Sequence, residues 1–454
     1  MVRHGTRRLG RSVTILATVL LLSLLRWDGV SAQPPSRYDA YYGTYLVTPQ
    51  HLVGIDKYIT EDSGESTMLF SDYQSGIVRR LFPISQTEFI MGPGFNDNSP
   101  IELHVQFIKD GHGAVTGISM RSSKGESTKA SRVPLREENV VVNNDPVKLA
   151  GTLFTPTTEG PHPAIILLHG SGPLTRFSFG PYPHFFTSLG FAVLTYDKRG
   201  TGASSGTLLD ASTGTLMAPS YYPDELVSDA LAAVHFLQGR NDVNSRKVGL
   251  WGTSEGGMLT TQVAARSKDV AFIIDSSGFM GPLWETASYQ MGAFLRSQGV
   301  SKSDVEKATM FTDMWLRVAR TGQGWDEFVK QRDEMRKEDK LWFIQSSGDF
   351  ASLDQMRWDW DHILTFSPIP TLKEVTCPAL AVYGEADTLT QVSVAVRNMR
   401  AALTQSGNKN FTIKVFPNAG HSLSEVPSGS RMAPGVFEAL RSWLLEQTAD
   451  DVSH

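Results

Sequence analysis

Cysteine is almost absent from the sequence, since Cys377 is the single one among 454 residues. One cysteine can form no disulfide within the chain and cannot supply the thiolates of a structural zinc site. Cys377 begins the apolar segment CPALAVYG, so we expect it to pack in the core rather than to react. The length of the chain is enough for two or three domains, each with its own hydrophobic core.

The chain also lacks an apolar run long enough to cross a membrane. The longest one, from Ser12 to Leu25, is shorter than the roughly 20 residues that a spanning helix needs. Arginines precede this run and the small residues VSA follow it, which is typical of a secretory signal. We therefore expect residues 1–32 to be a signal peptide, the protein to be exported to a periplasm or secreted, and the mature chain to have no stable membrane insertion.

Positive charge is not in excess. The formal net charge is −5, and the expected signal carries five arginines and one aspartate, so its removal leaves the mature chain near −9. Such an acidic chain is not expected to bind nucleic acid. Because the sequence contains no metal-ligand pattern, phosphate loop or nucleotide motif, we expect no metal site and no cofactor. The oligomeric state stays open.

The order of apolar segments divides the mature chain into two parts. Short alternating segments broken by turns indicate an antiparallel β domain at residues 33–136. Residues 137–454 contain near-continuous apolar runs separated by helical stretches, which predicts a doubly wound, mostly parallel α/β sheet. A helical stretch at about 281–366 interrupts this alternation, and we interpret it as a lid insertion. We expect catalysis in the α/β domain and an accessory role for the β domain.

The pattern G-x-S-x-G, which is typical of serine hydrolases, occurs twice, around Ser254 and around Ser204. A nucleophilic serine needs a sharp turn between a strand and a helix, because that turn exposes the hydroxyl. Ser254 has this setting, with the apolar segment KVGLW before it and the helix-forming segment MLTTQVAAR after it. Ser204 lies between YDKRGT and TLLDASTGT, whose composition favours a loop. We therefore predict that Ser254 is the nucleophile.

A serine hydroxyl is a poor nucleophile near neutral pH, so it needs a histidine base and an acid that orients the histidine. In serine hydrolases built on an α/β sheet of this kind, these residues follow the serine in the order acid, then histidine. Asp387 follows the apolar strand ALAVYG, and His421 follows the next strand, FTIKVF. We predict Asp387 as the acid and His421 as the base, with Glu385 and Asp275 as alternative acids.

The turn HGSGP after the strand AIILLH is the candidate for the oxyanion hole. Its glycines let the backbone approach a reacting carbonyl group, whose developing negative charge backbone N–H groups stabilise. We predict the amides of Ser171 and Glu255 as the donors, with Gly170 or Gly172 as the alternative in the loop. His169 is expected to support this turn rather than to act in catalysis.

Five segments, HGSGP, YDKRGTGASSG, GLWGTSEGGM, CPALAVYGEAD and NAGHS, occur in this order within about residues 137–448. In this order they resemble α/β-hydrolases of the bacterial carboxylesterase and serine aminopeptidase-like (S33-type) kind. The resemblance implies Ser254 as nucleophile, Asp387 as acid and His421 as base. The segments YYGTYLV, RRLFPISQTEFI and FIKDGHGAVTGISM resemble the lipocalin-like accessory domain found beside many bacterial serine hydrolases, which implies a structural or substrate-shaping part.

The predicted lid insertion holds six of the nine tryptophans: Trp284, Trp315, Trp325, Trp342, Trp358 and Trp360. We predict that Trp284 and Trp315 line an apolar acyl pocket, although packing within the lid explains them equally well. The expected reaction is therefore hydrolysis of a small-molecule carboxylic ester with an apolar acyl group. Alternatives are an aminopeptidase or an acyl thioesterase with the same triad, and a catalytically inactive binding protein with the same fold.

Overall fold

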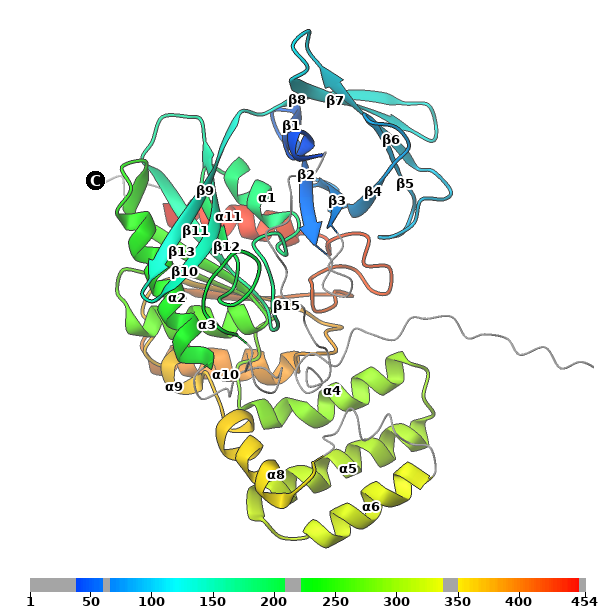
Figure 1. The fold of residues 1–454 in the computed structure, drawn as a ribbon, viewed down its shortest axis with the longest axis vertical. Coiled ribbons are helices and arrows are strands. Elements are labelled where there is room, and N and C mark those ends of the chain that lie inside the picture. Colours follow the sequence, from blue (N-terminus) through cyan, green and yellow to red (C-terminus); the bar gives the residue numbers. More distant parts are fainter. Residues whose placement is uncertain (1–37, 60–65, 209–221, 338–349, 449–454) are drawn as a thin grey trace, which may run out of the picture.

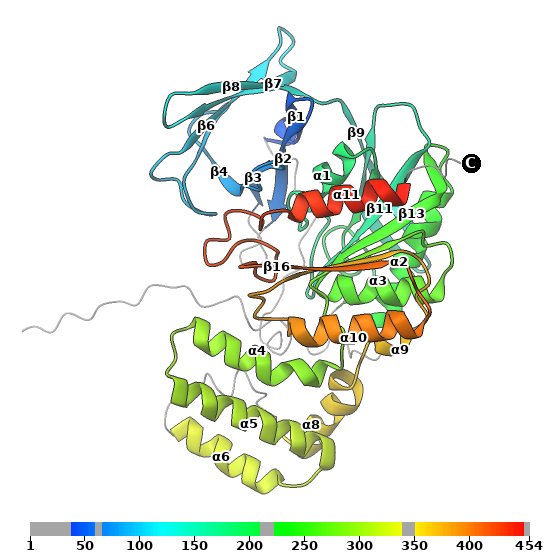
Figure 2. The same cartoon turned by 180° about the vertical axis from the view of Figure 1, so that it is seen from behind.

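The computed structural model describes residues 38–59, 66–208, 222–337 and 350–448. The expected signal peptide, residues 1–32, lies outside the described residues. Among the described helices, none has both the length and the hydropathy that crossing a bilayer requires. Figures 1 and 2 show a β-barrel and a group of helices at opposite ends of the long axis, with an α/β sheet between them.

The first part is a closed antiparallel barrel in which each strand pairs with the next and β1 pairs with β8. Its elements are η1 (Asp39–Tyr41), β1 (Gly43–Thr48), β2 (His51–Ile59), β3 (Ser66–Asp72), β4 (Val78–Pro83), β5 (Glu88–Met91), β6 (Leu103–Lys109), β7 (Val115–Ser122) and β8 (Ser127–Arg132). The ring of Tyr41 stacks on Phe107 with centroids 4.1 Å apart, and Phe89 is fully buried beside them. The barrel interior is therefore a packed apolar core.

The second part is an eight-stranded sheet with the order β16-β15-β14-β13-β11-β12-β10-β9. Its strands are β9 (Leu135–Asn144), β10 (Val147–Pro156), β11 (His162–Leu168), β12 (Ala192–Tyr196), β13 (Val243–Thr253), β14 (Ile273–Ser276), β15 (Ala379–Gly384) and β16 (Phe411–Phe416). The pairs β9–β10 and β10–β12 are antiparallel, and the remaining pairs are parallel. The expected α/β class, with a mostly parallel sheet after an antiparallel β domain, is confirmed.

Helices cover both faces of this sheet. One face packs against α2 (Tyr222–Gln238), α3 (Glu255–Arg266), α9 (Ile369–Leu372) and α10 (Val392–Gln405). The opposite face packs against α1 (Tyr182–Ser188) and α11 (Val436–Thr448). The strands β11, β12, β14 and β15 between them are buried on both sides, which explains their continuous apolar sequences.

The direction of winding reverses at β11. From β11 the chain passes to β12 on one side and then crosses to β13 on the other side. The loops that follow β11 and β13 therefore run in opposite directions along the sheet, and in open α/β sheets ligands bind outside the carboxyl ends of the strands at such a reversal. The HGSGP turn follows β11 and Ser254 follows β13, so both lie at this reversal.

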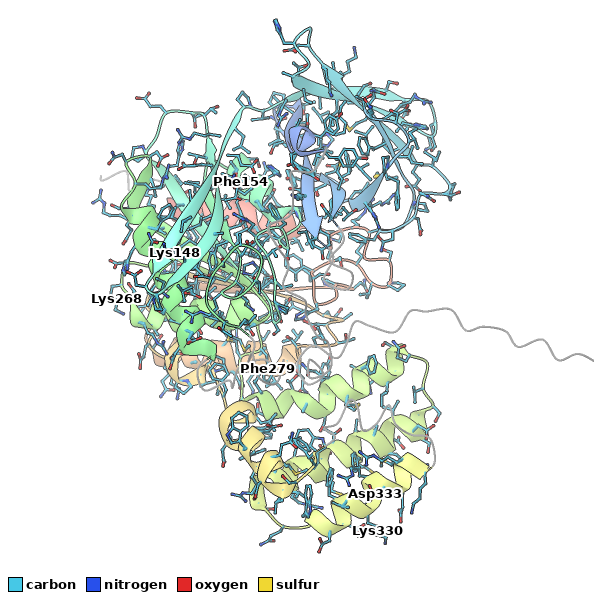
Figure 3. The ribbon with its side chains drawn as sticks, viewed as in Figure 1. Lys148, Phe154, Lys268, Phe279, Lys330 and Asp333 are labelled. Carbon is cyan, nitrogen blue, oxygen red and sulfur yellow. The ribbon has the colours of Figure 1, made fainter. Side chains whose placement is uncertain are left out.

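The third part is a helical insertion between β14 and β15. It contains α4 (Leu283–Ser297), α5 (Lys302–Thr321), α6 (Trp325–Lys337), α8 (Leu353–Asp359) and the π-helical turn η2 (Trp360–Leu364). The N–H of Leu283 donates to Phe366 O at 3.1 Å, so the two ends of the insertion meet. In Figure 3, Phe279 lies near this junction with the sheet, whereas Asp333 of α6 lies at the far end.

The barrel is joined to the α/β part by buried contacts. Asp56 of β2 accepts a hydrogen bond from His184 Nδ1 of α1 at 2.6 Å, and both side chains are buried. The ring of Tyr73, beyond β3, packs against Phe185 of α1 and Phe437 of α11, each with centroids 5.3 Å apart. The outer edge of the barrel thus shares a core with the α/β part.

Candidate active site

Ser254 lies in the sharp turn between β13 and α3, with φ of 55° and ψ of −116°. A residue other than glycine in such a sparsely populated conformation carries a strain of about 1–3 kcal/mol and needs support from its surroundings. The N–H of Ser254 donates to Ser276 O at 2.8 Å, and Ser254 O accepts from the N–H of Met258 at 3.2 Å. Ser254 therefore has the strand–turn–helix setting that a nucleophilic serine requires.

The first turn of α3 approaches the end of β11 closely. A Cβ atom added to Gly256 would lie 2.2 Å from Leu168 O, so a larger residue would push the helix away from the strand. A Cβ atom added to Gly170 would lie 3.6 Å from Ser254 Cβ, which places the HGSGP turn against the serine. The predicted donors, the amides of Ser171 and Glu255, thus belong to the two backbone segments that adjoin Ser254.

Ser204 has a different environment. Its Oγ donates to Asp197 O at 2.6 Å and accepts from the N–H of Ala150 at 2.9 Å. The hydroxyl therefore ties the loop after β12 to β10, and the residues up to 208 form no helix after it. This arrangement agrees with the loop expected for Ser204 and gives its side chain a structural role.

His421 and Asp387 form a direct contact in which Nδ1 lies 2.8 Å from Oδ2. Asp387 is fully buried, and its other carboxylate oxygen accepts from the N–H groups of Leu389 and Thr390 at 2.7 and 2.8 Å. The carboxylate orientation is therefore fixed by three hydrogen bonds. When His421 Nδ1–H donates to Asp387, Nε2 of the neutral ring is left as a proton acceptor.

The two alternative acids are placed differently. Glu385 is exposed. Asp275 is fully buried, and its carboxylate accepts hydrogen bonds from Tyr383 O–H at 2.6 Å and from the N–H of Gly278 at 2.8 Å. Burial raises the pKa of Asp275 to about 7. Asp275 thus holds the end of β14, whereas Asp387 is the carboxylate in contact with His421.

Backbone hydrogen bonds connect the strand ends along this edge of the sheet. The N–H of Ser277, after β14, donates to Val382 O of β15 at 2.9 Å. The N–H of Ala386 donates to Ala419 O at 2.8 Å, which joins the Asp387 loop to the loop of His421. Together with the bond from Ser254 to Ser276, these contacts form a continuous connection from the serine to the histidine loop.

Lys198 is a buried residue that joins the two segments beside Ser254. Its Nζ donates to Gly170 O at 2.7 Å, to Gly172 O at 3.1 Å and to Glu255 Oε1 at 2.6 Å. The side chains of Lys198 and Glu255 are 2 % and 9 % exposed, so each needs the other to offset the loss of hydration. Lys198 therefore fixes the HGSGP turn relative to the N-terminus of α3.

His169 also supports the HGSGP turn. Its Nε2–H donates to Thr175 O at 3.1 Å. Burial, together with the nearby charge of Lys198, lowers the pKa of His169 to about 3. The ring is thus neutral at ordinary pH, and its contacts agree with the supporting role predicted for it.

Two supports of the site were missed by sequence reasoning. Lys198 and Glu255 carry opposite charges just after β12 and β13, so their pairing had a signal in the sequence, although only the strand order brings the two together. The second support is α4 of the insertion, where Tyr289 O–H donates to Asp387 O and Gln290 Nε2 donates to Leu389 O. The sequence of α4 carries no comparable signal for these contacts.

The predicted pocket tryptophans occupy different places. Trp315 is fully buried in the core of the insertion, with its ring centroid 5.3 Å from that of Phe350. Trp284 is half-buried at the start of α4, with its centroid 6.1 Å from that of Trp360. Trp342 lies outside the described residues. The position of Trp315 favours packing within the insertion, which was the alternative explanation for these residues.

Two further observations concern reactive groups. Burial raises the pKa of the Cys377 thiol to about 11, so this side chain is a neutral thiol at ordinary pH. Within the four described stretches of chain, no group of three or more histidine, cysteine, aspartate or glutamate side chains is arranged to hold a metal ion.

The fold and the site together define a class. A mostly parallel sheet, a serine on the turn after β13 and an Asp–His pair beyond β15 and β16 are the features of an α/β-hydrolase. The sequence profile of the X-Pro dipeptidyl-peptidase family (S15 family) matches residues 145–413, which is more than half of the chain. The chain belongs to this family, and the α/β-hydrolase superfamily expected from the sequence is confirmed.

The sequence identity to individual proteins is low. Esterase EstD of Thermotoga maritima is 27 % identical over 332 residues, which cover 70 % of this chain and 69 % of the relative. An uncharacterised 31.7 kDa protein of Escherichia coli is 25 % identical over 248 residues, which cover 53 % of this chain and 78 % of the relative. A solved esterase of Pyrococcus furiosus is similar with a TM-score of 0.44 and 16 % identity, covering 69 % of this chain and 91 % of that chain. The family and the esterase relative from Thermotoga show that the protein is a serine hydrolase of the α/β type.

Removing the buried charge of Lys198 tests its role in the site. Lys198→Met leaves Glu255 buried without its partner, and we expect a loss of about 3–5 kcal/mol in the free energy of unfolding. Because the HGSGP turn loses its anchor, we also expect kcat for ester hydrolysis to fall at least about tenfold. Denaturant unfolding and steady-state kinetics measure the two effects.

Arg199→Met is the matched control. Arg199 is the next residue in the chain, but its buried side chain is directed at α2, where it pairs with Asp229 and Glu225, each at 2.7 Å. We expect a comparable loss of stability and a kcat within about twofold of the wild-type value. Equal losses of kcat in both variants would show that Lys198 acts on overall stability alone.

Proposed function

We propose that this protein hydrolyses small-molecule carboxylic esters with an apolar acyl group, with Ser254 as nucleophile, His421 as general base and Asp387 as the acid that orients the histidine. The observation that carries the proposal is the 2.8 Å contact between His421 Nδ1 and Asp387 Oδ2, on the sheet edge that also holds Ser254. A fixed carboxylate and a half-buried imidazole provide the oriented base that a serine hydroxyl needs.

In the first half of the proposed reaction, Ser254 Oγ attacks the ester carbonyl carbon while His421 Nε2 takes the hydroxyl proton. The carbonyl oxygen becomes negatively charged, and the amides of Ser171 and Glu255 stabilise it by about 3 kcal/mol each. The intermediate then collapses and the C–O bond to the leaving group breaks. His421 gives its proton to the departing alcohol, and the acyl group remains bound to Ser254.

In the second half, water takes the place of the alcohol. His421 Nε2 accepts a proton from the water as its oxygen attacks the acyl carbon. Collapse of the second intermediate breaks the bond to Ser254, and His421 returns the proton to the serine oxygen. The products are a carboxylic acid and the free enzyme. Asp387 stays ionised throughout and holds the imidazole ring in orientation.

The named relatives support an ester substrate, because the Thermotoga relative is called an esterase. The name of the matched family, X-Pro dipeptidyl-peptidase, favours a peptide as the second candidate. An acyl thioester is a third, since all three substrates pass through an acyl-enzyme. Values of kcat/KM for p-nitrophenyl esters, acyl-CoA and X-Pro p-nitroanilides, measured side by side, separate them, and we expect the highest value for an ester.

The two G-x-S-x-G serines provide a direct comparison. Ser254→Ala should abolish both hydrolysis and labelling by a fluorophosphonate probe, because the attacking oxygen is removed. Ser204→Ala should keep both near wild type and lose about 1–3 kcal/mol of stability, since it leaves the N–H of Ala150 without its acceptor. Activity and labelling retained by folded Ser254→Ala would refute the proposed nucleophile.

A histidine base also sets the pH dependence. The imidazole acts only when it is neutral, so kcat/KM should fall as the pH is lowered and the imidazole becomes protonated. Initial rates from pH 5 to 9, measured with a substrate whose acylation limits turnover, test this expectation. A rate that stays level over the whole range would argue against a histidine base.

The tryptophans of the insertion test the acyl preference. We expect Trp284→Ala to lower kcat/KM more for octanoate than for acetate esters, since each methylene that packs on an apolar wall contributes about 0.8 kcal/mol. Trp315→Ala should instead reduce the stability of the insertion by about 3–5 kcal/mol and affect both esters equally. If Trp284→Ala also affects both esters equally, Trp284 does not line the acyl pocket.

A further inference from the structure

The loop that carries His421 runs from Phe416, the last residue of β16, to Val436, the first of α11. It contains two residues other than glycine with positive φ, Asn418 at 54° and Leu423 at 61°. Such a conformation is unfavourable for a bulky side chain and persists only where the surrounding structure fixes it. The contacts of this loop therefore decide where the imidazole lies.

Part of this support comes from within the loop. The N–H of Glu425 donates to Arg431 O at 2.8 Å, and the N–H of Ala433 donates to Leu423 O at 2.8 Å. These bonds fold the loop into an irregular hairpin whose returning limb contains Arg431 and Met432. The other edge of this limb still needs partners for its backbone groups.

The barrel supplies these partners through the turn between β3 and β4. Met432 donates its N–H to Gly76 O at 2.7 Å, and Val78 donates its N–H to Ser430 O at 3.1 Å. The two bonds form an antiparallel bridge between Ile77 and Arg431. The barrel turn thus acts as a further strand of the hairpin that follows the histidine.

Side chains add a second level of contact. Leu423, which has the strained backbone, is fully buried in a hydrophobic cluster that also contains Leu69, Tyr73 and Val78 of the barrel. Met432 of the returning limb belongs to the same cluster. The apolar support of the histidine loop therefore comes partly from the outer edge of the barrel.

The barrel also contacts the segment that continues the HGSGP turn. The N–H of Ile59, at the end of β2, donates to Phe177 O at 3.3 Å. The ammonium group of Lys57 lies 4.2 Å from the centroid of the Phe177 ring. Since the barrel interior is filled by its own side chains, its influence on the site passes through this outer edge.

From these contacts we infer that the barrel is a positioning part of the active site, because its β3–β4 turn holds the His421 loop in the conformation that places the imidazole against Asp387. Gly76 is the key position in this turn. This inference rests on the proposed function of His421 as the base. The barrel, which the sequence predicted to be an accessory domain, then has a direct effect on turnover.

Gly76→Asn tests the inference with controls in the same barrel. Gly76 has φ of +78°, and a Cβ atom there would lie 3.0 Å from Met432 O. Gly113 and Gly125 have φ of +84° and +87°, but a Cβ atom at either would have no neighbour within 4 Å. Asparagine tolerates this backbone conformation, so the three variants carry similar strain and differ in the collision with the histidine loop.

We expect Gly76→Asn to lower kcat at least about tenfold with little change in KM, because a displaced base slows proton transfer without removing substrate contacts. Gly113→Asn and Gly125→Asn should remain within about twofold of wild type. Steady-state kinetics and thermal unfolding of the three variants make the comparison. If Gly76→Asn does not fold, Gly76→Ala, with the smaller side chain at the same place, should show a weaker effect in the same direction.

A double-mutant cycle separates positioning from a general effect on stability. If Gly76 acts through the imidazole, Gly76→Asn should have no further effect on the rate of phosphonate labelling when His421 is already alanine. Independent effects that multiply would overturn the inference. A folded Gly76→Asn variant with wild-type kcat, or a Gly76→Ala variant with wild-type kcat if Gly76→Asn does not fold, would also overturn the inference. In that case, loss of activity in Ser254→Ala and in His421→Ala would leave the proposed function intact. Full activity in His421→Ala would instead refute the proposed function itself.

Discussion

The backbone conformation of Ser254 is the constraint from which the rest of the site follows. A φ of 55° at a serine is retained only if β13 and α3 are both held in place. Gly256 allows the first turn of α3 to meet the carboxyl end of β11. The HGSGP turn that follows β11 must then lie against the serine, and Lys198 links that turn to Glu255.

The other two candidate residues lie on irregular loops, and each loop is supported by a part of the chain outside the sheet. The Asp387 loop accepts hydrogen bonds from Tyr289 and Gln290 of the helical insertion. The His421 loop pairs with the barrel turn around Gly76. The sheet thus holds Ser254, the insertion contacts the loop of Asp387 and the barrel contacts the loop of His421.

Much of the regular structure could be predicted from local patterns. The apolar strand before Ser254 and the helix-forming residues after it indicated the turn, and the short alternating segments within residues 33–136 indicated an antiparallel β domain. These features depend on neighbours in the sequence. Asp387 and His421 were also predicted as partners, because each follows an apolar strand and they come after the serine in the order acid, then histidine.

The remaining features depend on contacts between distant segments. Lys198 meets Glu255 because β12 and β13 lie on either side of β11. The two charged residues by themselves do not predict this strand order. The bond from Met432 N–H to Gly76 O and the bond from Val78 N–H to Ser430 O join backbone atoms, so the types of the side chains do not reveal them. The aromatic composition of the insertion fitted a pocket and a core equally well, so the burial of Trp315 had to come from the structure.

The central claim is that an acyl group is transferred to Ser254 during turnover. The most direct measurement is mass spectrometry of the enzyme quenched in acid during hydrolysis of a p-nitrophenyl ester, followed by peptide mapping. The account predicts a mass increase of one acyl group, located on the peptide that contains Ser254 and dependent on His421. An acyl group on a different residue, or rapid turnover with unmodified Ser254 under conditions in which deacylation limits the rate, would contradict it.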